Sequence, residues 1–235
     1  AQIRIVYLLG KRGQYAEAEA TFRKGLDQQF KPPTSFYYGL GLVKMATDSL
    51  KAATLWLIRA TEADPRKGAY HKALGDVYAK QQVTELAIDE YGRALELEPN
   101  SAEVHYAMGK LYFKDRKWQE TVKAWKEAVA ADSNFVPAYV DLINFFLIMK
   151  PPHYEEAIPF LKKAVEFNPN DTQLPVELAK AMGKTPSYRA EAFPFLEKAV
   201  TLVPEDVEVH ALIGDLSLEK KDYARAVQAY KKATQ

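Results

Sequence analysis

The sequence predicts an all-α fold, an alpha-alpha superhelix in which antiparallel helix pairs wind into a right-handed solenoid. Two observations predict it. Apolar residues follow the spacing of three and four positions that places them on one face of a helix, and residues of three types return at intervals of 34 positions. The residues that share this interval are Pro65 and Pro99; Gly41, Gly75 and Gly109; and Ala60, Ala94 and Ala128. Three residue types in one register indicate a repeated structural unit.

Residues 102–135 show how one copy forms two helices. The apolar stripe of the first helix, helix A, consists of His105, Met108, Gly109 and Tyr112. The stripe of the second, helix B, consists of Trp118, Thr121, Trp125 and Ala128. Glycine and alanine at these places allow the two backbones to approach closely, and aromatic residues fill the space beside them. Proline ends helix B in most copies, because it lacks an amide hydrogen and disfavours helix in the residue before it.

The order of these residues, with leucine–glycine, tyrosine, alanine, an aromatic residue and proline, resembles that of the tetratricopeptide family. The clearest copy carries Leu74, Gly75, Tyr78, Ala87, Tyr91, Ala94 and Pro99. The resemblance covers the whole chain, which we expect to form a single repeat domain, 1–235, with about thirteen or fourteen helices and no strand. Its copies are residues 1–32, 34–67, 68–101, 102–135, 136–171, 172–206 and 207–235.

Two copies depart from the common length. One has extra residues near Pro151 and Pro152, and the other near residues 185–187. We expect these residues to lengthen the turn between helix A and helix B without breaking the stack. Side chains suited to an N-cap stand before the next helix A at Ser101, Asp171 and Asp206.

The two terminal copies are incomplete. The first supplies Tyr15, Ala18 and Phe22 but lacks the start of its helix A, and the last stops after Ala233. Repeat arrays usually need a polar capping helix at each end. We therefore expect the array to continue or to pack end to end with a neighbour. The residues expected to be partly uncovered there are Tyr223, Ala226, Val227 and Tyr230.

Composition excludes several classes of protein. The formal net charge is +1, whereas a general nucleic-acid binder normally has a clear basic excess. The absence of cysteine excludes disulfides, thiolate metal sites and cysteine catalysis, and favours the bacterial envelope or periplasm over the cytoplasm. The longest apolar stretch, residues 145–149, is far shorter than the ~18 residues that a membrane span needs.

No catalytic, cofactor or metal site is predicted. Phosphate loops, HExxH and nucleophile-elbow patterns do not occur. His71, His105 and His210 occupy the same place in three copies, and a whole helical hairpin separates neighbouring equivalents, whereas metal ligands must converge on one point. We interpret these histidines as packed structural residues. His153 has no partner histidine nearby in sequence. The chain is therefore not expected to be an enzyme.

The resemblance implies that the A helices line a concave groove. In the copy 102–135 a second helix A stripe mixes aromatic and basic residues, and in other copies the matching positions are apolar or basic. We expect a partner protein or peptide with apolar and acidic residues to bind there. The predicted site is Tyr38, Leu42, Met45, Lys72, Asp76, Lys80, Tyr106, Lys110, Phe113, Lys114, Asn144 and Ile148. The apolar members have an alternative role, because they could pack against the next helix A.

Three functions fit a helical repeat array. The favoured one is a non-catalytic protein-interaction scaffold within a larger protein or assembly. The alternative is a regulatory or targeting segment of an enzyme whose catalytic domain lies outside this chain. A pentatricopeptide-like RNA reader is disfavoured, because it needs small polar residues at the fifth position of each helix A. The residues found there are Tyr38, Lys72, Tyr106, Val140, Val176 and Ala211.

Overall fold

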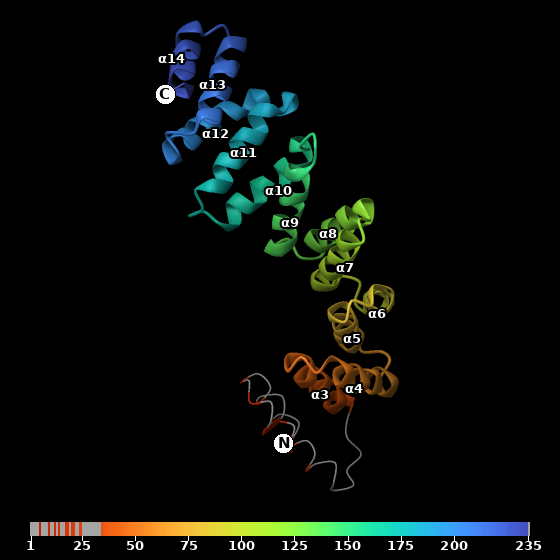
Figure 1. The fold of residues 1–235 in the computed structure, drawn as a ribbon. Helices are drawn as coiled ribbons and strands as arrows, with labels where there is room; N and C mark the ends of the chain where they lie inside the picture. Colours follow the sequence, from red (N-terminus) through yellow and green to blue (C-terminus); the bar gives the residue numbers. More distant parts are fainter. Residues whose placement is uncertain are drawn as a thin grey trace. The chain divides into compact units, whose positions relative to one another are not determined.

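The computed structural model describes residues 34–234 and the single positions 5, 9, 12, 14, 17, 18, 20, 21 and 24. Residues 34–234 contain twelve α-helices, one short 3-10 helix and no strand (Figure 1). The A helices are α3 (Thr34–Ala46), α5 (Gly68–Lys80), α7 (Ala102–Lys114), α9 (Val136–Ile148), α11 (Gln173–Lys184) and α13 (Val207–Glu219). The B helices are α4 (Leu50–Ala63), α6 (Thr84–Leu97), α8 (Trp118–Ala131), α10 (Tyr154–Phe167), α12 (Arg189–Leu202) and α14 (Tyr223–Ala233). The other expected helices fall on residues 1–33.

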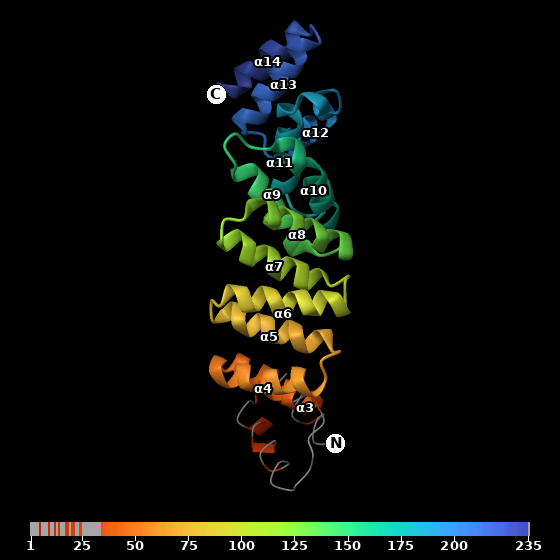
Figure 2. The same cartoon turned by 90° about the vertical axis from the view of Figure 1, so that its right-hand side faces the viewer.

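The helices pack in the order of the chain. Each A helix packs against the B helix that follows it, and the chain forms two compact units, Ala1–Asp132 and Ser133–Gln235. Within the first unit, α4 contacts α5 and α6 contacts α7, so that successive hairpins lie in layers (Figure 2). Within the second, α10 contacts α11 and α12 contacts α13. The prediction of an all-α solenoid built from helix pairs is confirmed.

Glycine on helix A receives a large side chain from helix B. A Cβ atom built on Gly75 would lie 2.6 Å from the Tyr91 ring, and one on Gly109 would lie 2.3 Å from the Trp125 ring. Gly41 faces Leu57 and Gly214 faces Tyr230 in the same way. The close approach expected between two backbones is thus mainly an approach of a side chain to a backbone. In the first copy Ala18 is fully buried and packs with Phe36, Leu40 and Val43, whereas Tyr15 and Phe22 lie outside the described residues.

Four of the turns between helix A and helix B share one backbone structure. Each has three residues, and the middle one has a positive φ: Asp48 at 56°, Gln82 at 64°, Arg116 at 58° and Lys221 at 62°. In each, amides bond back to carbonyls of the preceding helix in the pattern of a Schellman motif. The two longer copies depart here, as predicted, with residues 149–153 in one turn and a 3-10 helix, Pro186–Tyr188, in the other.

The expected N-caps have different outcomes. The Asp206 carboxylate accepts the Val209 amide at 3.0 Å, and the Asp171 carboxylate accepts the Gln173 and Leu174 amides. Ser101 occupies the N-cap of α7, as expected, but its side chain forms no capping hydrogen bond. In α14, Tyr223 and Val227 are 62% and 52% exposed, whereas Ala226 is buried.

Candidate functional site

The most prominent feature of the A-helix surface is an aromatic cluster on the copy 102–135. The Trp125 ring occupies the space above Gly109, and the rings one helical turn before and after this glycine lie against it. The Tyr106 centroid is 6.4 Å and the Phe113 centroid 5.7 Å from that of Trp125. Phe113 nevertheless remains 46% exposed. The cluster therefore extends from the core to the surface.

Lysines accompany these aromatic residues. The Lys110 ammonium lies 5.6 Å from the Tyr106 ring centroid, a distance typical of a cation–π contact. Lys80 and Lys114 stand at the same place, the last residue of α5 and of α7. Within the part of the chain that the structure describes, none of these three lysines forms an ion pair. Their charge remains available to an acidic partner.

Lys72 and Asp76 have partners within the chain. The Lys72 ammonium lies 3.2 Å from the carboxylates of both Asp76 and Glu103. Burial alone would lower the pKa of Lys72, but these carboxylates outweigh it and hold the pKa above its ordinary value. Asp76 also accepts the Tyr91 hydroxyl at 2.7 Å. Burial and this carboxylate raise the pKa of Tyr91 well above its ordinary range.

The predicted site residues of α3 pack towards the next repeat. Tyr38, Leu42 and Met45 are half-buried against the cluster that contains the buried α5 residues Ala73, Leu74 and Val77. The Tyr38 ring also stacks on Tyr70 with centroids 4.8 Å apart. Packing against the next helix A, the alternative role considered for the apolar members, is therefore observed directly for Tyr38, whereas Leu42 and Met45 pack against a cluster that α4 and α5 share. Their part in binding stays a prediction.

The last two predicted site residues belong to the second unit. Asn144 and Ile148 lie on α9, and both are exposed, with Ile148 at 75%. Val140, one turn before Asn144, is 44% exposed. The helix thus presents a partly apolar stripe without lysines, which differs in chemistry from the stripe on α7.

Elsewhere in the second unit the lysines of helix A are neutralised. The Lys180 ammonium lies 2.8 Å from Asp206 and 3.2 Å from Glu208, and Lys184 pairs with Glu208. Lys184 also donates to the Tyr154 hydroxyl at 3.0 Å. Burial opposes the charged forms of both carboxylates, but the lysines outweigh it and hold the pKa values of Asp206 and Glu208 below their ordinary values.

This cluster should make the stability of α13 depend on pH. Since the folded-state pKa values of Asp206 and Glu208 are lowered, the folded state holds fewer protons than the unfolded state, and the stabilisation is complete above the unfolded pKa values. We expect it to decline from about pH 5 downward. Hydrogen exchange of the α13 amides should therefore accelerate as the pH falls, after correction for intrinsic rates. The double variant Asp206→Asn with Glu208→Gln should lose this part of the dependence, and an unchanged slope in the variant would contradict the assignment.

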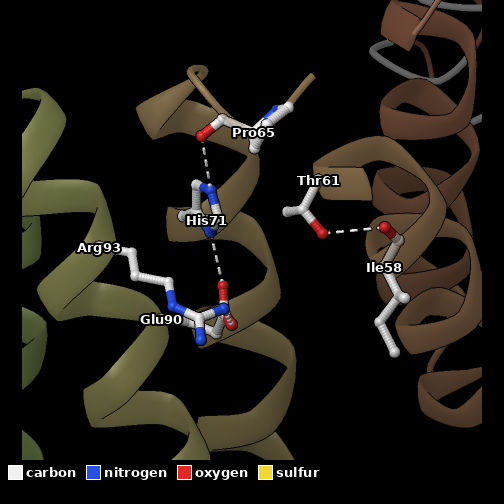
Figure 3. Close-up of polar contacts among 6 residues, drawn as sticks. All are labelled: Ile58, Thr61, Pro65, His71, Glu90 and Arg93. Atoms are coloured by element: carbon white, nitrogen blue, oxygen red, sulfur yellow. Dashed lines mark hydrogen bonds and ion pairs between the residues drawn. The ribbon is translucent and has the colours of Figure 1, made fainter. Parts of the chain in front are cut away.

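The three equivalent histidines form hydrogen bonds to other groups of the protein. Figure 3 shows that His71 bridges the Pro65 carbonyl, 3.1 Å from Nε2, and the Glu90 carboxylate, 2.7 Å from Nδ1. Arg93 contacts the other Glu90 oxygen at 2.8 Å. His105 and His210 likewise bond to the proline carbonyl that ends the preceding copy. These contacts are those of packed structural histidines that tie one repeat to the next.

The acidic partners of the lysines were not among the residues predicted from the sequence. Glu103 and Glu208 both occupy the second position of their copies, and each pairs with a lysine of the preceding copy. Of the six copies from residue 34 onward, only these two have an acidic residue at this place, so an alignment of the copies would not have revealed the contacts. Within the described residues, no helix is long and apolar enough to cross a membrane, and no group of three or more His, Asp and Glu residues could hold a metal ion.

Comparison with known protein families finds matches in both units. A family model described as "TPR repeat" matches residues 75–115. A second, described as "Tetratricopeptide repeat", matches residues 153–171 and 207–235. No curated protein sequence matches the chain significantly.

Several solved structures share the fold. The C-terminal part of a TPR repeat-containing protein from Cytophaga hutchinsonii has a TM-score of 0.68 at 17% identity, covering 98% of this chain and 93% of its own. A tetratricopeptide repeat protein from Parabacteroides merdae has a TM-score of 0.61 at 19% identity, covering 99% and 91%. YrrB, described as a TPR protein with an unusual peptide-binding site, has a TM-score of 0.56 at 18% identity, covering 86% and 97%. At these identities the likeness concerns the fold.

Proposed function

The chain is a tetratricopeptide repeat protein, and we propose that it is a non-catalytic scaffold that binds a partner protein or peptide on the A-helix surface of its repeats. The observation that carries this proposal is the stripe of Tyr106, Lys110, Phe113 and Lys114 on α7. A stripe that only packs has no need of unpaired lysines, and a stripe that is only solvated gains nothing from a phenylalanine that is 46% exposed.

The proposed site is centred on α5 and α7, which contact one another in the first unit. Lys80, at the end of α5, adds a further cation that forms no ion pair within the described residues, whereas Lys72 and Asp76 would have to exchange their internal partners to contact a ligand. A ligand with carboxylates and apolar side chains therefore suits the C-terminal halves of these two helices. Asn144 and Ile148 are proposed as a separate, more apolar contact on α9.

The aromatic residues and the lysines should contribute differently. Full burial of a large apolar side chain contributes ~1.5–3 kcal/mol, and about half of the Phe113 surface is already buried. Completing its burial should contribute about 1 kcal/mol, or about fivefold in Kd. An exposed lysine–carboxylate pair contributes only ~0.2–1 kcal/mol. The aromatic residues should therefore determine affinity, and the lysines should determine association rate and salt dependence.

The test begins with a partner isolated by pull-down. Phe113→Ala and Tyr106→Ala should each weaken its binding by about fivefold, because each removes apolar contact area. Lys110→Glu should weaken binding mainly at low ionic strength. Titration calorimetry at two salt concentrations measures both effects, and circular dichroism checks that each variant is folded.

A matched control uses the opposite surface of the repeats. Leu55 lies on the B helix α4 and is 65% exposed. Leu55→Ala removes exposed apolar area of similar kind without touching the proposed site, so it should leave Kd unchanged. If Leu55→Ala weakens binding while the three site variants do not, the partner binds the B-helix surface, and the proposed site is wrong.

A further inference from the structure

A second cationic surface lies at the turn between α7 and α8. Residues 110–118 contain four basic side chains and one acidic side chain, although the whole chain carries a net charge of only +1. Lys114, Arg116 and Lys117 are all exposed at this turn and form no ion pair within the described residues. Lysines elsewhere, such as Lys72 and Lys180, pair with a glutamate of the next repeat. The turn is therefore locally basic in a chain that is nearly neutral as a whole.

Two aromatic residues border the same turn. Phe113 is 46% and Trp118 45% exposed, and their rings meet edge to face with centroids 5.5 Å apart. Phe113 also stacks on the buried Trp125 ring, which fixes the pair to the core. Together these residues define the turn surface: Phe113, Lys114, Arg116, Lys117 and Trp118. It combines exposed apolar area with cations, as protein-binding surfaces do.

The backbone of the turn is rigid. The Arg116 amide donates to the Phe113 carbonyl at 3.1 Å, and the Lys117 amide donates to the Tyr112 carbonyl at 2.9 Å. Arg116 has a φ of 58°, the left-handed conformation that this motif requires. Because these bonds fix the turn before any partner arrives, binding would lose little backbone entropy.

We propose that the turn surface is a docking site for an acidic segment of a partner protein, a stretch in which carboxylates flank an apolar side chain. The apolar side chain covers the exposed edges of Phe113 and Trp118, and the carboxylates lie beside Lys114, Arg116 and Lys117. The inference rests on the proposed partner-binding function and extends it beyond the A-helix surface to the end of the hairpin.

An acidic segment fits this surface better than an anionic membrane does. Asp115 lies within the turn and Glu120 follows it closely, and both are exposed. A flat bilayer would meet these carboxylates together with the cations, whereas a narrow segment can pass between them. The two aromatic rings are also packed against each other and against Trp125, so they are not arranged as a wedge that enters lipid.

The turn backbone provides a matched pair of variants. Arg116→Gly removes one cation and keeps the turn, because glycine adopts positive φ at no steric cost. Gln82→Gly makes the same backbone change in the equivalent turn of the preceding repeat, where φ is 64° and the side chain is uncharged. Both variants should raise the midpoint of thermal unfolding. Only Arg116→Gly should weaken binding of an acidic ligand, by about two- to fivefold at low ionic strength.

The probe is a short synthetic peptide in which glutamates surround two leucine–phenylalanine pairs, with a lysine counterpart as the control. Binding is measured by fluorescence anisotropy, and its location by the NMR signals of backbone amides and tryptophan indoles. We expect the acidic peptide, and not the basic one, to shift the Trp118 indole and the amides of residues 114–118. Trp118→Leu, which retains an apolar residue as at the equivalent Leu50, should weaken binding by about fivefold.

Four outcomes would overturn this inference. In the first, the acidic peptide shifts only residues of the A-helix stripe such as Tyr106 and Lys110, which leaves the proposed function intact. In the second, vesicles containing phosphatidylserine shift the turn signals and the acidic peptide does not. In the third, Arg116→Gly and Gln82→Gly bind the peptide equally well. In the fourth, neither the acidic nor the basic peptide binds. Failure of the proposed function would be seen in a separate experiment, in which Tyr106→Ala leaves the binding of the partner isolated by pull-down unchanged.

Discussion

Replacing His71 with leucine should lower the free energy of unfolding of α5 and α6 by about 3 kcal/mol. The His71 and Glu90 side chains are only 7% and 10% exposed, and their polar atoms lie 2.7 Å apart. Removal of the imidazole leaves the Glu90 carboxylate buried, with Arg93 as its remaining partner in the pair of contacts shown in Figure 3. Loss of this hydrogen-bond partner is costly because the carboxylate stays desolvated.

His105 provides the control, because it occupies the same position one repeat later. It also bonds to a proline carbonyl, but its partner Glu127 is 44% exposed and lies 3.3 Å away. His105→Leu should therefore cost only about 1 kcal/mol. The double variant His71→Leu with Glu90→Leu should recover much of the loss, because it removes the buried carboxylate that has lost its imidazole partner.

The measurement should resolve individual repeats, since helical arrays can unfold locally. Hydrogen exchange of the α5 and α6 amides reports the affected hairpin, and the α7 and α8 amides report its neighbour. Equal losses for His71→Leu and His105→Leu would show that the buried carboxylate is not the cause. The buried carboxylate would also be excluded as the cause if the double variant were less stable than His71→Leu alone.

Most of the fold could be predicted from the repeat period. It placed the helix pairs of residues 34–234, the turns between them and the two positions where extra residues lengthen a turn. These features could be predicted because each depends on residues close together in sequence: an apolar stripe, a proline, or a change in spacing. The division into two compact units could not be predicted, because the repeat period continues across residue 132.

The candidate site was less predictable than the fold. A helical stripe identifies which residues share a face, and the exposure of Phe113 agrees with that inference. It does not identify the partner of each charge, because a lysine can reach carboxylates of its own copy and of the next. Lys72 and Lys180 are each neutralised by one carboxylate of either kind, whereas Lys110 forms no ion pair within the described residues. The role of Tyr38 likewise depends on Tyr70, which comes from the following repeat.

The second large effect concerns the aromatic cluster of Tyr106, Phe113 and Trp125. Gly109→Ala should destabilise α7 and α8 by about 1–3 kcal/mol. The added Cβ would lie 2.3 Å from the Trp125 ring, which is 3% exposed and is packed against the rings of Tyr106 and Phe113. The ring cannot withdraw without displacing both. Binding at the proposed site should weaken as well, because these two rings belong to it.

Gly92→Ala is the matched control, since nothing lies within 4 Å of a Cβ built on this glycine of α6. It should stabilise its helix by up to about 1 kcal/mol, the usual advantage of alanine over glycine. Opposite signs for the two glycine substitutions, measured by chemical denaturation, would show that the close contact and not helix propensity decides the effect at Gly109.

A second substitution tests the contact itself. In the copy 172–206 the equivalent positions hold Ala179 and Leu196, and both residues are fully buried. Because leucine leaves room for an alanine there, Gly109→Ala combined with Trp125→Leu should be more stable than Gly109→Ala alone. Binding should not recover, since the ring that supports Tyr106 and Phe113 is absent. If stability and binding recover together, the Trp125 ring does not position the site, and the aromatic cluster is only a part of the core.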